Sequence, residues 1–161
     1  MSQIKVLLTG LLFILLQITL LNLVTIQGIK PDLIVLFIVG RALAAGPTAG
    51  VIWGFCLGFL LDTISGGPTG LGALAYSLSG FISGWIGSGR TKTQLRYLIT
   101  LALGAAVSFG VFYYFQQPWN IIGWTKPLLT STLPGIIYTW ALGLIWVLTP
   151  FTQFKESKGR G

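Results

Sequence analysis

The stretch GPTAGVIWGFCLGFLLDTISGGPTG, residues 46–70, has a small residue at every fourth position until it reaches an acid. The series runs through Gly46, Gly50, Gly54, Gly58 and Asp62. Residues four apart lie nearly above one another on a helix, so we expect the glycines to form a groove with the acid near its end. In lipid, small residues let two helices approach closely. The groove therefore predicts packing against another helix of the same chain or against a helix of a partner protein.

Asp62 is the most informative single residue of this stretch. Ionisable side chains inside membrane spans are costly, and the dipole of a helix opposes an acid at its C-terminus. A structural partner could be the turn Ser65-Gly66-Gly67 or a basic residue expected at the same end, Lys30 or Lys126. A contact with a partner protein, or an ion or substrate site, would be the functional alternatives. The turn that ends the stretch is expected at Gly66, Gly67, Pro68 and Gly70.

The composition around this stretch is that of a membrane protein. Of 161 residues, 53% are hydrophobic and 8% are charged, with 10 Lys and Arg against 3 Asp and Glu. A soluble globular chain carries about 25% charged residues. The chain therefore lacks the polar groups needed to cover a surface that faces water, and little of it remains for a soluble domain.

Six apolar stretches, separated by charges or by Pro and Gly, predict an all-α, polytopic six-helix transmembrane bundle. The expected spans are 6–26, 33–45, 48–65, 71–87, 97–115 and 128–148, in one integral membrane domain over residues 1–161. The first exceeds the length of a signal-peptide core and lacks a small-residue cleavage site, so we interpret it as a retained helix. The second is short for a crossing. It could be tilted, extended at its ends, or partly re-entrant against neighbouring protein.

The basic residues favour an orientation with both termini in the cytoplasm, because Lys and Arg in short loops stay on that side. With six spans, the other side would hold only Lys30 and Lys126. The cytoplasmic set is Lys5, Arg90, Lys92, Arg96, Lys155, Lys158 and Arg160. We interpret the loop at 88–96 and the C-terminal tail as determinants of topology, with binding to anionic lipid the lesser alternative and no nucleic-acid partner. Arg41, inside the second span, is expected to extend towards the same interface.

The inventory of reactive side chains excludes most enzymatic chemistry. The chain has no His, one Cys (Cys56) and three carboxylates, Asp32, Asp62 and Glu156. A Ser-His-Asp triad, a His-ligated metal site or a disulfide within one chain needs groups that are missing. We therefore expect no catalytic residue, no metal and no cofactor.

Three sequence motifs together resemble the MreD family of bacterial rod shape-determining membrane proteins. They are KPDLIVL at 30–36, GxxxGFxxGxLLDxxSG at 50–66 and GLxALAYxLxG at 70–80. The resemblance implies a non-enzymatic component of the cell-elongation machinery in the bacterial plasma membrane. It implies action beside MreC, MreB, the glycosyltransferase RodA and a class B transpeptidase in side-wall peptidoglycan synthesis. The family is also similar in architecture to the substrate-binding subunits of energy-coupling-factor transporters, although a shared fold does not decide function.

Two functions follow as hypotheses. The first is a scaffold whose outer faces hold partner helices, with MreC as the direct partner, the other components reached indirectly, and self-association left open. The second is a transporter subunit that binds a small molecule or lipid, which would need a polar pocket at membrane depth. Most polar residues inside the expected spans are hydroxyls, which can bond to their own helix. The sequence therefore favours the scaffold.

Overall fold

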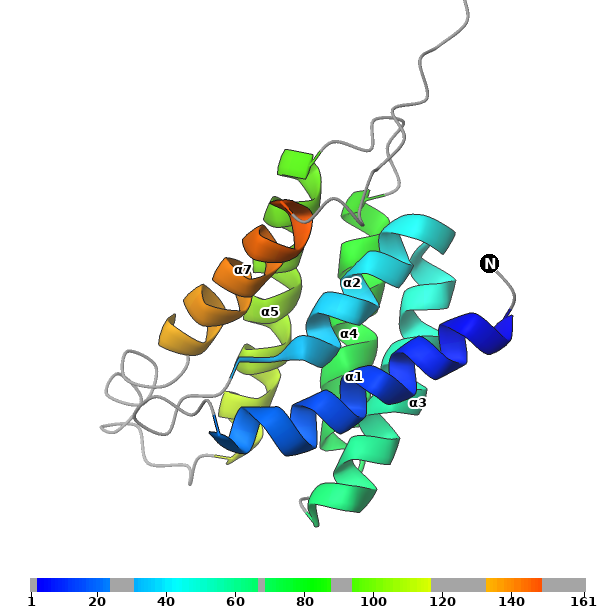
Figure 1. The fold of residues 1–161 in the computed structure, drawn as a ribbon, viewed down its shortest axis with the longest axis vertical. Coiled ribbons are helices and arrows are strands. Elements are labelled where there is room, and N and C mark those ends of the chain that lie inside the picture. Colours follow the sequence, from blue (N-terminus) through cyan, green and yellow to red (C-terminus); the bar gives the residue numbers. More distant parts are fainter. Residues whose placement is uncertain (1–2, 24–30, 67–68, 88–93, 117–132, 149–161) are drawn as a thin grey trace, which may run out of the picture.

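The chain folds as a bundle of helices in a computed structural model that describes residues 3–23, 31–66, 69–87, 94–116 and 133–148 (Figure 1). The described helices are α1 (Gln3–Leu23), α2 (Leu33–Ala45), α3 (Pro47–Ser65), α4 (Leu71–Gly87), α5 (Gln94–Gln116) and α7 (Leu133–Leu148). The expected all-α fold with six apolar helices is confirmed for these residues.

The helix boundaries follow the punctuation of the sequence. α2 and α4 begin and end at the expected residues, and α3 begins one residue early because Pro47 fits the first position of a helix. α1 and α5 both start three residues before the expected spans. The expected residues 24–26 of the first span and 128–132 of the last lie outside the described part of the chain.

The short second helix, α2, is the centre of the bundle. It contacts each of the other five described helices, and its residues from Ile34 to Val39 are all buried. A helix that is apolar all round can be buried in this way. With 13 residues it measures roughly 20 Å, less than the ~30 Å hydrocarbon core. Of the three geometries left open by the sequence, the structure excludes extension at the ends, because α2 does not continue beyond Asp32 or Gly46.

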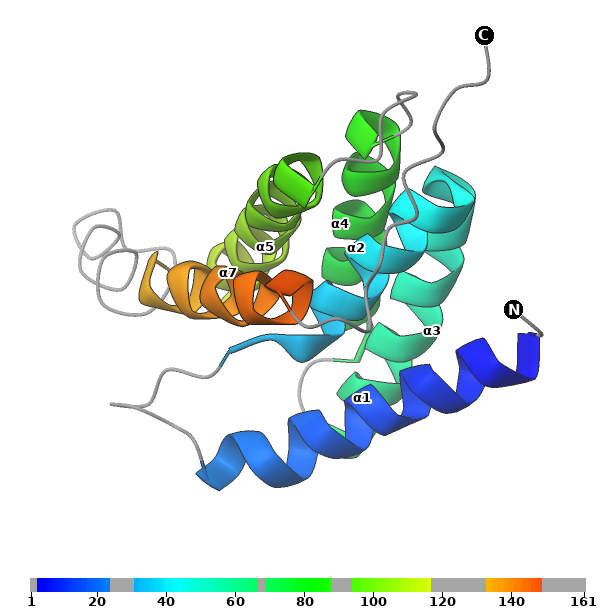
Figure 2. The same cartoon turned by 45° about the horizontal axis from the view of Figure 1, so that its top comes forward.

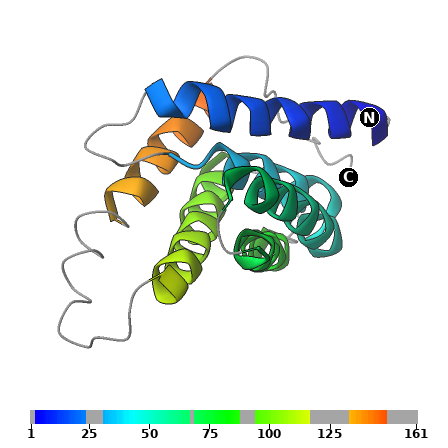
Figure 3. The same ribbon diagram turned by 90° about the horizontal axis from the view of Figure 1, so that it is seen from below.

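The remaining helices surround α2 in two groups. α3, α4, α5 and α7 each contact the next in that order. Among the described helices, α1 contacts only α2 and α3, and it runs obliquely across them on the outside of the bundle (Figures 2 and 3). Phe13 of α1 packs on Phe37 of α2, with ring centroids 5.6 Å apart. The aromatic contact therefore joins the outer helix to the central one.

Two described helices, α3 and the Gln94–Phe115 part of α5, are long and apolar enough to cross a membrane. The other four are shorter apolar helices. The outward faces of long and short helices alike carry large exposed apolar side chains, such as Leu15 of α1, Phe55 of α3 and Trp85 of α4. This distribution suits a bundle surrounded by lipid.

Candidate functional site

The glycine face of α3 lies directly against the backbone of α4. A Cβ atom placed on Gly50 would lie 2.5 Å from the carbonyl oxygen of Gly80. A Cβ on Gly58 would lie 2.5 Å from the carbonyl oxygen of Gly72, and one on Gly54 would overlap the backbone at Tyr76. Cβ atoms essentially never approach other atoms within 3.0 Å. Only glycine therefore permits this spacing between the two helices.

The contact is reciprocal, because α4 presents small residues at the matching positions. A Cβ on Gly80 would overlap the backbone of Gly50, and one on Gly84 would overlap Pro47 at the start of α3. Gly50, Gly54 and Gly58 of the predicted groove are thus covered by α4 of the same chain. Gly46 does not continue the groove, because it lies between α2 and α3 at φ 90° and a Cβ there would meet no described atom within 4 Å. A partner protein would have to use another surface.

Asp62, near the C-terminal end of α3, accepts hydrogen bonds from backbone N–H groups at the start of α4. Its Oδ2 atom accepts hydrogen bonds from the N–H groups of Gly70 and Gly72, both at 2.9 Å, and of Ala73 at 3.3 Å. Its Oδ1 atom accepts a second bond from Gly72 at 3.1 Å. The first N–H groups of a helix have no partner within it and favour negative charge. Asp62, which is 7% exposed, supplies α4 with acceptors for these N–H groups and with a negative charge at its N-terminus.

These donors lie beyond the Ser65-Gly66-Gly67 turn, which was one of the structural partners expected from the sequence. The chain reverses after α3, with Gly66 and Gly70 in left-handed conformations at φ of 66° and 100°, which glycine adopts without strain. The reversal brings the start of α4 beside the last turn of α3. Gly67 and Pro68, together with the proposed partners Lys30 and Lys126, lie outside the described residues.

The opposite end of α4 receives a positive charge. The Nη2 atom of Arg96 on α5 donates a hydrogen bond of 2.6 Å to the carbonyl oxygen of Ile86. A cation near the last carbonyl groups of a helix is favourable. α4 is therefore stabilised at its start by an acidic side chain from α3 and at its end by a basic side chain from α5. The other basic residues expected to set topology, Arg90, Lys92, Lys155, Lys158 and Arg160, lie outside the described residues.

The second described acid, Asp32, forms a buried junction at the start of α2. Its Oδ1 atom accepts hydrogen bonds from the N–H groups of Ile34 and Val35, at 3.0 and 3.2 Å. Its Oδ2 atom accepts one from the Tyr76 hydroxyl of α4 at 2.8 Å. Its own N–H group donates to Oγ1 of Thr139 on α7 at 2.9 Å. One residue thus caps the central helix and links it to α4 and α7.

Gln17 brings α1 to the same junction. Its Oε1 atom accepts a hydrogen bond from the N–H group of Leu33 at 2.9 Å. It therefore satisfies a further free donor at the start of α2. Side chains from α1, α4 and α7 all meet the N-terminus of the central helix here.

In the sequence, Lys30-Pro31-Asp32 marks only a boundary between two spans, and this junction was not predicted. Asp before an apolar run is a signal for a helix N-cap, so the contacts to Ile34 and Val35 could have been found. Tyr76 and Thr139 are 44 and 107 residues from Asp32. No local pattern links residues so far apart.

Tyr76→Phe tests the junction by removing one hydroxyl. The ring contact with Phe112, at 5.7 Å between centroids, would remain. We expect the free energy of unfolding in mixed micelles to fall by about 1.5 to 3 kcal/mol, as for hydrogen bonds to charged groups. Thr63→Val serves as the control, because within the described part of the chain its exposed hydroxyl donates to the carbonyl oxygen of Phe59 on its own helix. Equal stability of Tyr76→Phe and wild type would contradict a Tyr76–Asp32 bond that stabilises the fold.

The chemistry that this arrangement supports is helix positioning. Both described acids already accept bonds from the chain, and the described residues include no group of three His, Cys, Asp or Glu able to hold a metal ion. The hydroxyls of Ser79 and Ser83 are buried, face Gly104 and bond to no described atom.

Comparison with known proteins bears on the same helices. The model of a family described as rod shape-determining protein MreD matches residues 1–130, which include the glycine face, Asp62 and Asp32. No curated protein and no solved structure matches the chain.

Proposed function

Because the chain belongs to the MreD family of rod shape-determining proteins, we propose that it is a scaffold of the bacterial cell-elongation machinery that binds MreC directly. Members of the family are polytopic membrane proteins without enzymatic activity. Through MreC, the chain would help to regulate side-wall peptidoglycan synthesis by RodA and the class B transpeptidase, in coordination with MreB.

The observation that carries this proposal is how the bundle uses its polar and small residues. Asp32, Asp62 and the three glycines of α3 hold helices of the same chain together. The outward faces are apolar, as lipid and partner helices require. This arrangement supports a rigid bundle with a lipid-facing surface for a partner helix over a carrier whose interior polar groups bind a substrate.

Co-purification with MreC of the same organism tests the proposal. We expect a stoichiometric complex in neutral detergent. A membrane protein of similar size with no part in elongation, expressed in place of this chain, controls for trapping in shared micelles. If the purified chain carries a small molecule and no MreC, the result would contradict the scaffold proposal and support the transporter-subunit alternative.

The orientation with both termini in the cytoplasm is part of the proposal and predicts a labelling pattern. In a variant with Cys56→Ser, a new Cys at Gly89 or Ser157 should not react with a membrane-impermeant maleimide applied to spheroplasts. A Cys at Gln117, in a loop expected outside, should react. Labelling at Gly89 or Ser157 in intact spheroplasts would overturn the orientation.

A further inference from the structure

Arg41, on α2, is a half-buried cation whose Nε atom is buried and unpaired among the described residues. Arg41 follows Phe37 by four residues and therefore lies on the same side of α2. Phe37 contacts Phe13 of α1 and Trp53 of α3. Arg41 thus faces the space between α1 and α3, one turn nearer the end of α2.

The carboxylates of the described residues are too far away to neutralise Arg41. Asp32 is at the opposite end of α2, nine residues or roughly 13 Å along the helix. Asp62 is also far from Arg41. Gly50 of α3 lies beside Ala42, next to Arg41, and Asp62 follows Gly50 by twelve residues, or about 18 Å along the helix. Both acids are occupied by other donors. Only Glu156 remains in the sequence, and it lies outside the described residues.

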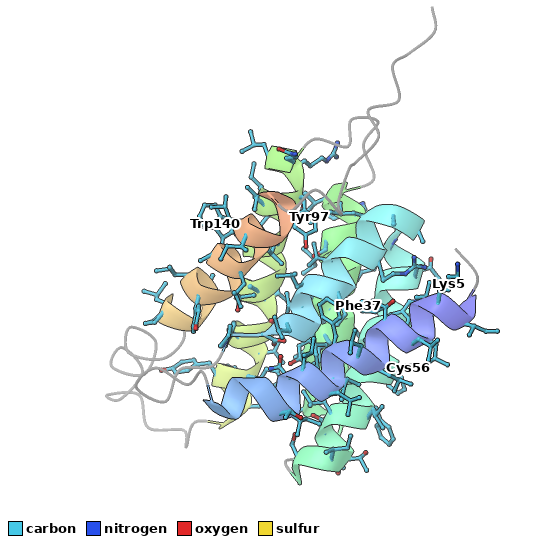
Figure 4. The ribbon with its side chains drawn as sticks, in the orientation of Figure 1. Lys5, Phe37, Cys56, Tyr97 and Trp140 are labelled. Carbon is cyan, nitrogen blue, oxygen red and sulfur yellow. The ribbon has the colours of Figure 1, made fainter. Side chains whose placement is uncertain are left out.

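A second cation lies towards the same end of the bundle. α1 and α2 run antiparallel, since Gln17 bonds to Leu33 while Phe13 packs on Phe37. Lys5 precedes Phe13 by two turns and so lies on nearly the same face of α1. Figure 4 shows Lys5 near the start of α1, beyond Phe37 along the bundle. Lys5 is exposed. An anion between α1 and α3 could therefore be approached by both side chains.

We propose that Arg41 binds the phosphate group of an anionic phospholipid between α1 and α3. A guanidinium matches phosphate oxygens with paired hydrogen bonds, and basic sites between membrane helices hold lipid headgroups. Arg41 is one turn from the end of α2, so its long side chain can reach the headgroup level. Next to it, a Cβ atom placed on Gly40 would have no described atom within 4 Å, which leaves open surface on α2 beside the site. In the orientation proposed above, this is the cytoplasmic leaflet.

Lipid titration by native mass spectrometry tests the site. We expect the wild type to bind one phosphatidylglycerol, and Arg41→Gln to weaken binding by about tenfold, the worth of one charge-assisted hydrogen bond. Lys126→Gln lowers the net charge equally in a loop expected on the opposite side of the membrane and should change binding less than about twofold. Phosphatidylcholine carries the same phosphate together with its own cation, so Arg41→Gln should weaken its binding less than that of phosphatidylglycerol. Equal affinity of wild type and Arg41→Gln for phosphatidylglycerol would overturn the proposal.

Three further measurements distinguish a bound lipid from other anions at Arg41 and from a folding defect of Arg41→Gln. Arg41→Lys keeps the charge and loses the paired geometry, so about threefold weaker binding is expected even if Arg41→Gln fails to fold; unchanged binding would contradict the proposal. Displacement of the lipid by millimolar inorganic phosphate would show a phosphate site and not a lipid site. About tenfold tighter binding of phosphatidylglycerol by Glu156→Gln would show that Glu156 pairs with Arg41 in place of the lipid, which would contradict the proposal.

Discussion

Gly54→Leu is expected to lower the free energy of unfolding by about 3 kcal/mol, at the upper end of the cost of overpacking. Even a Cβ at Gly54 would overlap the backbone of Tyr76, and a backbone cannot move aside as a flexible side chain can. The two helices would have to separate, which would also displace Gly50 and Gly58 from their contacts. Gly54→Ala should show a smaller loss in the same direction.

Gly110→Leu is the matched control for this change. Gly110 lies within α5 and has no described atom within 4 Å of a Cβ position, so Leu there meets open space. Its free energy of unfolding in mixed micelles should stay within about 1 kcal/mol of wild type, since Gly to Leu in a helix is intrinsically favourable. If Gly54→Leu and Gly110→Leu are equally stable, the close contact between α3 and α4 does not exist.

Asp62→Ala is expected to cost about 2 to 3 kcal/mol, because it leaves buried N–H groups of α4 without acceptors. Asp62→Asn should lose less. Its single side-chain oxygen can take the place of Oδ2, which accepts from Gly70, Gly72 and Ala73. The free energy of unfolding is therefore expected to decrease from wild type to Asp62→Asn to Asp62→Ala, and its measurement in mixed micelles checks this order. An Ala variant as stable as wild type would mean that the carboxylate does not hold α4.

The α3–α4 contact shows how far a local pattern reaches. The four-residue series predicted a close helix contact, because helical periodicity alone places those glycines on one face. The sequence left open whether α4 or a partner protein fills it. The answer depends on the reversal at Gly66 and Gly70, which sets the path of the chain after α3.

The acids show what the sequence could not supply. Asp62 was singled out because a charge in an apolar run is costly, yet its donors at the start of α4 were not among the partners considered, which were the nearer turn or a lysine. Asp32 was overlooked because it stands in a connection, where an acid is unremarkable. Its role depends on Tyr76 and Thr139 reaching it from other helices, and only the folded chain brings those residues together.

The two acids have a common function in the bundle. Each caps the first turn of a helix that is shorter than a full crossing, Asp32 for α2 and Asp62 for α4. A helix that begins inside protein cannot satisfy its first N–H groups with water. Asp32 therefore allows α2 to start within the bundle. Asp62 supplies acceptors to the first turn of α4 beside the exposed residues 63–66, so both acids have a structural role as helix caps.

The most direct test of the central claim is MreC co-purification and rod-shape rescue by Asp62→Asn, measured against the amount of folded protein. If Asp62 acts by holding α4, the amide variant should bind MreC and restore rod shape in proportion to its folded fraction. A folded Asp62→Asn protein that fails in both would contradict the account, since it would show that the negative charge itself serves the function.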